Sequence, residues 1–414
     1  MVFFDRTMDV DVVVAGGGTA GCAAAVAAAR RGHRVLLVEE SNSLGGVSTT
    51  GGVNEWFASL DGLGDIFARV IRELDAFGAR FGRFYNPEYL KIIWQLMVEE
   101  AGVEVLFHAS VIDAMAGDGR VHRVRLVSCS RAIEVTARYF IDATGEGDLA
   151  ALAGAQFMLG DPARGHTLHM SLTCLLHDTG QPVMPYLPPG LPPIDRVEDL
   201  PGLRTYHRLP DGRVYCNMTK VMAYDPTDPF DLSAAEREAR RQLIRTVHYL
   251  QRFHYPTYML CASGARIGIR EGRRIVGDYV LTEADITGAG PCDQADGVAV
   301  ATCQIDFHSL TQAGDAGRRQ RVEPYAIPLR CLVARGFANL LMAGKCASGD
   351  QVAQSSFRMT PTCCAMGQAA GTAVALALED AADDIRAVDI VRLRGELTAA
   401  GMELDPTRHQ AFAP

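Results

Sequence analysis

This chain of 414 residues lacks the sequence features that mark several large classes of protein. Its 40 lysines and arginines are outnumbered by 49 aspartates and glutamates, and no long basic run occurs. Nothing therefore favours a nucleic acid or an anionic membrane surface as a partner. No run of 18 apolar residues is present, so we expect no membrane-spanning segment and no membrane partner. Arg6 and Asp11 interrupt the apolar character of the N-terminus, which is unlike a signal peptide.

The cysteines exclude further classes. They number 11, are scattered without a Cys-x-x-Cys motif, and only Cys363 and Cys364 are adjacent. This pattern argues against a disulfide framework and against an iron–sulfur or zinc site, so we expect no metal. It fits a protein of the reducing cytoplasm best. A Gly-x-Ser-x-Gly motif is also absent, which leaves no basis for serine hydrolase chemistry.

The most informative feature is the segment of residues 10–21, Val-Asp-Val-Val-Val-Ala-Gly-Gly-Gly-Thr-Ala-Gly, with a Leu-Leu-Val-Glu segment ending at Glu39. It predicts a buried strand, a glycine turn, an alanine-rich helix and a second strand that ends in an acid. Gly16 permits the tight turn, Gly18 lets the backbone approach a pyrophosphate, and Gly21 lets the helix pack on the strand. The N-terminus of the helix would bind the phosphates, and Glu39 would accept hydrogen bonds from a ribose. The segment therefore predicts a dinucleotide-binding unit.

Strand-like segments at both ends of the chain enclose an irregular, proline-rich middle. Residues 62–101 predict two helices with a break between them, and a capping pattern at Ser233 predicts the start of a long arginine-rich helix. We expect an α/β fold in which a Rossmann-like domain with a parallel sheet is interrupted by a mixed α+β substrate domain. The expected division is residues 1–155 and 331–414 for the nucleotide domain and residues 156–330 for the inserted domain.

Three further turns favour FAD over NAD. Gly45-Gly46 follows the ribose acid, where a second turn could pass under the pyrophosphate. Ala143-Thr144-Gly145 ends a strand and permits another close approach. The last strand ends at Gly344, and the helix that opens at Pro361 could stabilise negative charge on a reduced flavin. Because no second Gly-x-Gly-x-x-Gly occurs, a tightly held FAD without a separate NAD(P)H domain is the simplest account.

With these motifs, the chain resembles the FAD-dependent oxidoreductases related to the fumarate reductase and succinate dehydrogenase flavoproteins. More narrowly, it resembles a bacterial subgroup of FAD-dependent dehydrogenases in that superfamily. Residues 157–260 match no motif that we can place, and the identity of the substrate should depend on them. The matching segments span most of the chain and are Glu39 and residues 16–21, 44–46, 142–148, 270–278, 327–330, 339–344 and 358–371.

The resemblance implies how the cofactor is surrounded. Gly344 would lie near the ribityl chain, and the segment from Pro361 to Cys363 near the isoalloxazine. The backbone at Ser110 and Val111 would contact adenine. From both arguments, the expected cofactor-binding residues are Gly16, Gly18, Thr19, Ala20, Gly21, Glu39, Glu40, Gly45, Gly46, Val111, Ala143, Thr144, Gly145, Gly344, Pro361, Thr362 and Cys363.

Hydride transfer at a flavin needs a substrate held over the ring, and a base where an O–H or N–H proton also leaves. Arg270 and Arg358 are candidates for binding a substrate carboxylate. Each could instead form a structural ion pair or anchor a loop. His308 and Tyr325 are candidates for the base or for orienting a substrate oxygen, and each could equally be a satisfied structural residue. These four residues form the predicted catalytic set.

The expected function is that of a soluble FAD-dependent oxidoreductase, a dehydrogenase or oxidase that moves a hydride between a small organic substrate and flavin. Oxygen or an electron carrier would reoxidise the flavin, and a homo-oligomer is compatible with the sequence. The alternatives are a flavoprotein with a net non-redox reaction, such as isomerisation or elimination, a non-catalytic flavin-binding module, and an NAD-only dehydrogenase. His166 and His169 lack the further ligands that a zinc site needs, although one of them could contact substrate or flavin.

Overall fold

The computed structural model describes residues 4–202, 204–288, 295–314 and 316–412, and a five-stranded parallel sheet lies at its centre. Four of its five strands are short apolar runs buried along their whole length, and the edge strand of residues 104–106 is partly exposed. Such runs are typical of a parallel sheet that is covered on both faces. In sheet order the strands are β21 (Leu340–Met342), β10 (Tyr139–Asp142), β2 (Val12–Ala15), β3 (Val35–Val38) and β6 (Glu104–Leu106).

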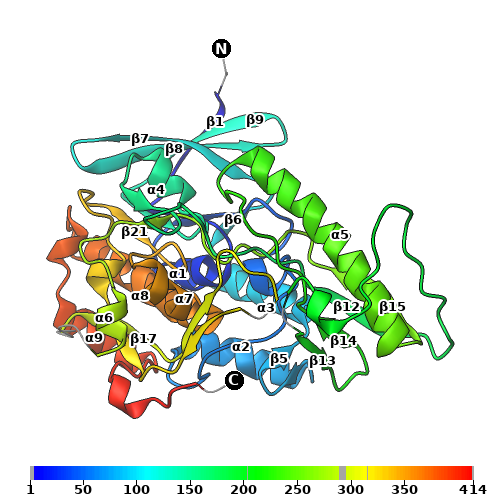
Figure 1. Ribbon diagram of the computed structural model, residues 1–414. Helices are drawn as coiled ribbons and strands as arrows, with labels where there is room; N and C mark the ends of the chain where they lie inside the picture. The colour runs from blue at the N-terminus through cyan, green and yellow to red at the C-terminus, as the bar shows by residue number, and fades with distance from the viewer. Residues whose placement is uncertain (1–3, 203, 289–294, 315, 413–414) are drawn as a thin grey trace.

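Helices cover one face of this sheet. α1 (Thr19–Ala29) packs against α8 (Thr360–Glu379) in the middle of the molecule (Figure 1). Both helices are rich in alanine and glycine, which lets their backbones come close. A Cβ atom at Gly371 would lie 2.2 Å from the carbonyl oxygen of Ala24. The other helices around this core are α2 (Asp65–Ala76), α3 (Pro87–Glu100), α7 (Gln351–Phe357) and α9 (Ile390–Ala399).

A second sheet covers the opposite face. Alternate residues of the central strands, such as Val13, Leu36 and Phe140, join its core, because successive side chains of a strand point to opposite faces. The first of its strands is polar in sequence and was not predicted, and it adds to the sheet by parallel pairing with β9. The strands are β1 (Phe4–Asp9), β9 (Arg131–Thr136), β8 (Arg120–Ser128) and β7 (Ser110–Gly117), and α4 (Asp148–Leu152) lies beside them (Figure 1).

The two-helix prediction for residues 62–101 is confirmed. α2 and α3 are separated by a small hairpin of β4 (Arg80–Phe81) and β5 (Phe84–Tyr85). α3 begins where Asn86 accepts a hydrogen bond from the Glu88 N–H and Pro87 occupies the first turn. Together with the central parallel sheet, this confirms the predicted α/β fold class.

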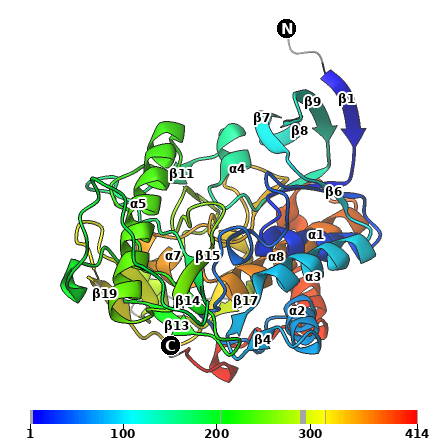
Figure 2. The same cartoon turned by 90° about the vertical axis from the view of Figure 1, so that its right-hand side faces the viewer.

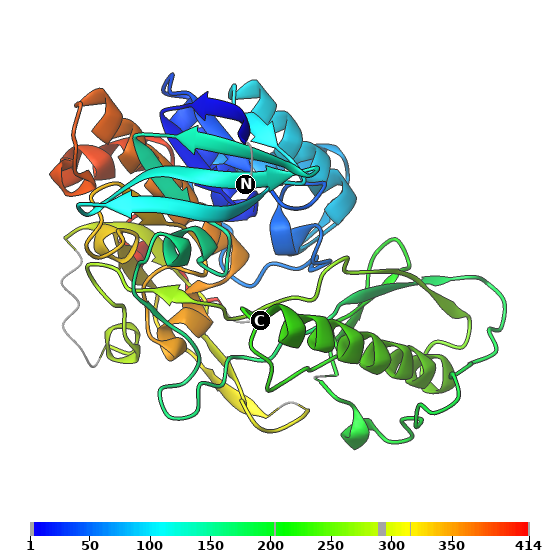
Figure 3. The same cartoon turned by 90° about the horizontal axis from the view of Figure 1, so that it is seen from above.

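An inserted region, drawn in green, projects from one side of the molecule (Figures 2 and 3). It has its own hydrophobic core, formed by residues between Met170 and Ile269. One long helix, α5 (Pro229–Phe253), packs beside an antiparallel sheet. The strands of that sheet, in order, are β13 (Tyr206–Arg208), β14 (Val214–Cys216), β12 (Cys174–Asp178) and β15 (Tyr258–Ser263).

The predicted start of α5 at Ser233 is wrong. The cap is Asp228, whose carboxylate accepts hydrogen bonds from the N–H groups of Phe230 and Asp231. Pro229 then occupies the first turn, where its missing N–H costs nothing. The helix therefore begins a full turn earlier, because the Asp-Pro pair is the stronger start signal.

After the insert, the chain returns to the first core. Most of the buried apolar residues described between Leu281 and Leu329 belong to the same hydrophobic cluster as α1 and α8. This clustering favours a boundary near residue 270, and the division at residues 155 and 330 stays a prediction. The returning elements are β16 (Arg274–Ile275), which pairs with β11 (Phe157–Met158), then α6 (Glu283–Ile286), β17 (Gly297–Ala301), β18 (Ile305–His308), β19 (Gly317–Gln320) and β20 (Tyr325–Pro328).

One helix of the described residues, α8, is long and apolar enough to cross a membrane by length and composition. Its most apolar window is 94% buried inside the protein. That burial, against α1 and β17, is what a core helix requires, so α8 is weak support for a membrane span.

Candidate active site

A cavity of about 860 Å³ opens at the carboxyl ends of the central strands, where ligands bind in open parallel sheets. Residues from all four predicted glycine turns line it, together with residues of the inserted region. Of the predicted cofactor-binding residues, those that line the cavity are Gly16, Gly18, Thr19, Ala20, Glu39, Glu40, Gly45, Gly46, Val111, Ala143, Thr144, Gly145, Gly344 and Cys363.

The first glycine turn contacts the second and the third at the cavity. Gly16 has φ +94°, and a Cβ there would lie 2.4 Å from the carbonyl oxygen of Ala143. The N–H of Gly45 donates to the carbonyl oxygen of Gly17 at 2.8 Å. A Cβ at Gly18 would meet nothing within 4 Å, so its backbone is open toward the cavity. The N-terminus of α1 therefore faces a space that a pyrophosphate can enter.

Glu39 lies at the end of β3 with only 7% of its surface exposed. Its Oε2 accepts from the Gly17 N–H at 2.7 Å and its Oε1 from the Ser41 N–H at 2.8 Å. A carboxylate offers about four acceptor positions, so two remain for a ribose diol. Hydrogen bonds from the glycine turn therefore fix the carboxylate in a position from which it could bind a ribose.

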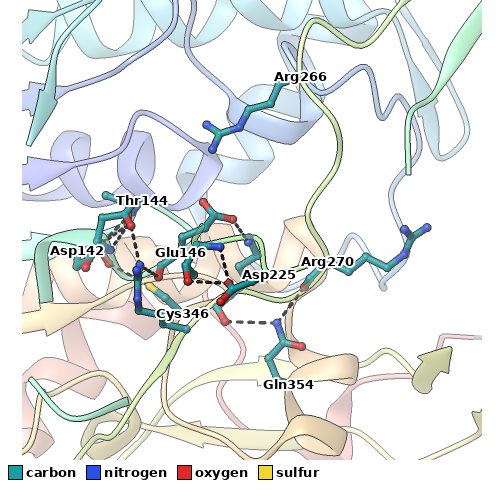
Figure 4. A network of polar contacts seen from close by, with 12 residues as sticks. Asp142, Thr144, Glu146, Asp225, Arg266, Arg270, Cys346 and Gln354 are labelled. Atoms are coloured by element: carbon teal, nitrogen blue, oxygen red, sulfur yellow. Dashed lines mark hydrogen bonds and ion pairs between the residues drawn. The ribbon is translucent and has the colours of Figure 1, made fainter. Parts of the chain in front are cut away.

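A buried acid holds the third turn. Asp142 accepts hydrogen bonds from the Thr144 N–H at 3.0 Å, the Thr144 hydroxyl at 2.7 Å and the Ala150 N–H at 2.8 Å (Figure 4). Burial raises the pKa of Asp142 to about 6, although these hydrogen bonds oppose it. Beside the turn, Glu146 and Lys345 form an ion pair at 2.5 Å, and both line the cavity.

Three predicted cofactor residues do not line the cavity. Gly21 lies under the turn, where a Cβ would be 1.8 Å from the carbonyl oxygen of Gly16, so it serves the packing of α1. Pro361 and Thr362 are buried in the first turn of α8. Their neighbours Thr360 and Cys363 line the cavity instead, because residues three positions apart lie on the same face of a helix. Burial raises the pKa of the Cys363 thiol to about 12.

Three of the four predicted catalytic residues form one cluster that meets this cavity at Arg358. Arg358 lines it, and its Nη2 donates to Asp306 Oδ2 at 2.9 Å. The same oxygen lies 3.1 Å from His308 Nε2. Arg270 does not line the cavity, and its Nη1 donates to the Ser171 hydroxyl at 2.8 Å.

The charges of this cluster act on one another. Burial alone would raise the pKa of Asp306, but the hydrogen bond of His308 and the positive charges of Arg358 and Arg270 outweigh it, so the pKa falls well below its usual range. Burial lowers the pKa of His308 to about 4, aided by both arginines and opposed by Asp306. Burial and the charge of Arg358 lower the pKa of Arg270 to about 10. At neutral pH the cluster is therefore an ionised Asp306, a neutral His308 and two cations.

His169 and Lys220 from the inserted region complete the cluster. The ring of His169 stands edge-on to that of His308, with 4.5 Å between centroids. Burial and the neighbouring charge of Arg270 hold the pKa of His169 well below its usual range. Its Nδ1 is buried and has no hydrogen-bond partner among the described residues. Lys220 is buried and donates to the carbonyl oxygen of Gly314 at 3.3 Å.

Tyr325 is placed elsewhere. Its hydroxyl donates to the Ser356 hydroxyl at 2.9 Å, and Ser356 donates to the carbonyl oxygen of Cys303 at 2.6 Å. Burial raises the pKa of Tyr325. The ring belongs to the hydrophobic core and does not line the cavity, so a structural role accounts for its contacts.

Sequence reasoning left Asp306, Lys220 and Arg266 unselected. Asp306 lies two residues before His308 on β18, so strand periodicity places both on one face and could have found it. Lys220 and Arg266 lie in the inserted region and carry no local signal. Arg266 lines the cavity from the side opposite the glycine turns and forms an ion pair with Glu40.

The geometry fits a dinucleotide. The glycine turns leave backbone open at the N-terminus of α1, Glu39 presents acceptors beside it, and Arg358 and Cys363 line the same cavity. Such a layout suits a long ligand whose reactive ring reaches the cationic cluster.

Comparisons with known proteins agree with this fit. A family model described as FAD dependent oxidoreductase matches residues 11–397. No match was found among curated proteins. A structure of BexE, described as concerned with oxidation during BE-7585A biosynthesis, has a TM-score of 0.50 and 14% identity, covering 95% of this chain and 69% of that one. This likeness concerns the fold alone.

Two further solved structures are similar over most of this chain. A geranylgeranyl bacteriochlorophyll reductase-like protein from Thermoplasma acidophilum is 11% identical, with a TM-score of 0.48, covering 97% of this chain and 90% of that one. The anhydrotetracycline hydroxylase OxyS from Streptomyces rimosus is 14% identical, with a TM-score of 0.44, covering 96% of this chain and 70% of that one.

Proposed function

The chain belongs to the FAD dependent oxidoreductase family, and from this premise we propose that it moves a hydride between a small anionic substrate and flavin. One observation carries the proposal: Arg358 lines the cofactor cavity and is also bonded to the Asp306–His308 pair. The reacting end of the cavity and the acid–base cluster therefore meet at this residue. FAD, when bound, supplies the group that accepts or donates the hydride.

The cations of the cluster suit an anionic substrate. Arg270 and Arg358 bring two positive charges to one ionised acid, Asp306. A carboxylate on the substrate would balance this excess and accept paired hydrogen bonds from a guanidinium. The partly accessible side chains of Arg270 and Arg358 are the ones we assign to this contact.

His308 is the proposed base. Because Asp306 accepts the hydrogen bond, Nε2 carries the proton and Nδ1 keeps its lone pair. Nδ1 would take the proton that leaves a substrate O–H or N–H as the hydride departs. Asp306 orients the ring and stabilises the charge that the histidine then carries.

The finer parts of the function rest on the same proposal. We infer a dehydrogenase or oxidase that oxygen or a carrier reoxidises, within the subgroup related to fumarate reductase and succinate dehydrogenase. A cytoplasmic place is supported by the cysteines, since those in the described residues are all free.

Purified protein tests the proposal directly. It should be yellow, and anaerobic mixing with a panel of 2-hydroxy acids, 2-amino acids and dicarboxylates should bleach the visible flavin band with at least one of them. A colourless preparation that cannot be reconstituted would overturn the proposal. Bound flavin with turnover that consumes no external acceptor would instead support isomerisation or elimination.

The anion site has its own test. Carboxylates should perturb the visible spectrum of the bound flavin, and R358Q should abolish the effect. The matched control is R330Q, which breaks another arginine–aspartate pair, Arg330 with Asp296 at 2.9 Å, outside the cavity wall. An equal response from the native protein and R358Q would contradict the assignment.

A further inference from the structure

The cavity has a second wall that comes from the inserted region. Leu232 and Glu236 of α5 and the segment of residues 265–269 face the glycine turns across it. This segment follows β15 and is fastened at both ends. The N–H of Ala265 donates to the carbonyl oxygen of Thr50 at 2.8 Å, and the N–H of Ile267 donates to Glu236 Oε1 at 2.7 Å.

The fastening is close at the Thr50 end. A Cβ at Gly264 would lie 2.6 Å from the carbonyl oxygen of Gly51. The Thr173 hydroxyl of the inserted region donates to that same oxygen at 3.1 Å. The segment is thus held against the loop that carries the second glycine turn, so its side chains have defined positions over the cavity.

Arg266 extends from this segment into the cavity. Figure 4 shows its side chain pointing toward the blue, N-terminal part of the chain, whereas Arg270 points the other way. The side chain is 41% exposed, and the residue lines the cavity. Burial lowers the pKa of Arg266 while the charge of Glu39 opposes the shift. A guanidinium stays protonated at neutral pH under such shifts.

The balance of charges in the cavity favours a phosphate as the ligand of Arg266. A dinucleotide brings two phosphate charges next to Glu39 and Glu40. Two other lining cations already have acid partners, Lys345 with Glu146 and Arg358 with Asp306. The guanidinium of Arg266 has five N–H donors and contacts Glu40 with part of them. It can therefore keep Glu40 and still donate to a phosphate.

We propose that Arg266 binds the pyrophosphate of FAD from the inserted region and so closes the cavity over the adenosine half of the cofactor. Retention of FAD then depends on how the insert is fastened to the nucleotide-binding part. The inference needs the cofactor but not the hydride-transfer reaction, so it can fail while the proposed function stands.

Titration of the full-length chain, freed of flavin, with FAD, ADP and riboflavin tests the proposal. R266A should weaken FAD and ADP by about tenfold or more, which is the loss of one charged hydrogen bond. Riboflavin has no phosphate, so its binding should not change. R266K should fall between, because lysine keeps the charge but not the fork of donors. R252A is the control, since Arg252 also belongs to the insert and pairs with Asp195 at 2.7 Å outside the cavity.

Two outcomes would overturn the proposal. In one, R266A binds ADP as tightly as the native chain does. In the other, R266A loosens riboflavin as much as FAD, which would mean a general loosening of the insert. Thermal unfolding of the flavin-free variants shows whether R266A folds as well as R252A does. If R266A is unfolded, the affinities of R266K for FAD, ADP and riboflavin test the proposal in its place.

A substitution of Glu40 distinguishes direct binding of phosphate by Arg266 from a role of Arg266 in holding Glu40. If Arg266 donates to phosphate, E40Q should bind FAD as tightly as the native chain or more tightly, because the arginine is released and one acid is removed. If Arg266 only holds Glu40 in place, E40Q should weaken FAD as much as R266A does, and that result would contradict the proposal.

Discussion

At the scale of single residues, buried charge decides the chemistry of the site. The hydrogen bond of His308 and two arginines hold Asp306 ionised, whereas burial, aided by the same arginines, holds His308 neutral. Both side chains would behave ordinarily in water. The two residues therefore owe their properties to neighbours that lie far away in the sequence.

Titration of His308 by NMR of labelled histidines should give a pKa near 4, from its usual 6.5. D306N should lower that pKa further, because Asp306 opposes the shift, and R358Q should raise it, because Arg358 contributes to it. Opposite shifts in the two variants would follow from the electrostatic account. Shifts in the same direction would show that the variants act by disturbing the packing.

The same shift makes stability depend on pH. The unfolded chain protonates His308 at a higher pH than the folded one, so stability falls as pH drops from about 6.5 to about 4. The contribution is about 3 kcal/mol. In H308Q, the free energy of unfolding should lose this part of its pH dependence, measured by denaturant titration across that window.

Glu55 should act with the opposite sign. Burial raises its pKa from 4.5 to about 7, although Arg83 lies 2.7 Å away and its charge opposes the shift. The folded chain then holds this proton at a higher pH than the unfolded chain, so stability falls as pH rises from about 4.5 to about 7. E55Q should flatten unfolding free energies in that interval. An unchanged slope would mean that another group carries it.

At the scale of elements, the contact between α1 and α8 depends on the absence of side chains. G371A would place a methyl group 2.2 Å from the carbonyl oxygen of Ala24 and push the helices apart. We expect a loss of roughly 1–3 kcal/mol in the free energy of unfolding, as for other overpacked cores, and weaker FAD binding because α1 opens at the cavity.

G395A in α9 is the matched control. It also adds a methyl group to a helical glycine, but a Cβ there meets nothing within 4 Å. It should therefore be neutral or stabilise by up to about 1 kcal/mol through helix propensity. Equal destabilisation by the two substitutions, in parallel denaturant titrations, would contradict the packing argument.

The helices and strands also differ in how well the sequence predicted them. The first strand–helix–strand unit, α2, α3 and α8 could be predicted because their signals are local: apolar periodicity, glycine turns and an Asn-Pro start. β1 could not, because its polar residues gain their place only by pairing with β9. The true start of α5 was local, at Asp228, but the capping pattern five residues later masked it.

At the scale of the whole molecule, the cofactor cavity joins two parts with separate hydrophobic cores. FAD should therefore act as part of the structure. Removing it should lower the midpoint of thermal unfolding, and adding FAD back should raise the midpoint with concentration, by about 2.7 kcal/mol of stability at a hundredfold excess over the dissociation constant. Calorimetry of the flavin-free and reconstituted protein measures both. A midpoint that does not change with FAD concentration would argue against a cofactor cavity formed by both parts of the molecule.

The chain's sequence alone determined the glycine turns, the acid at the end of β3 and the α/β class. These depend on backbone freedom and on periods of a few residues, which are written locally. Only the tertiary structure decided that Arg270, Arg358, Asp306, His308 and His169 meet, that Tyr325 stays in the core, and that Arg266 reaches Glu40. The reason is that β18 packs against α7 and the insert returns beside them, so distant residues become neighbours through topology and not through spacing.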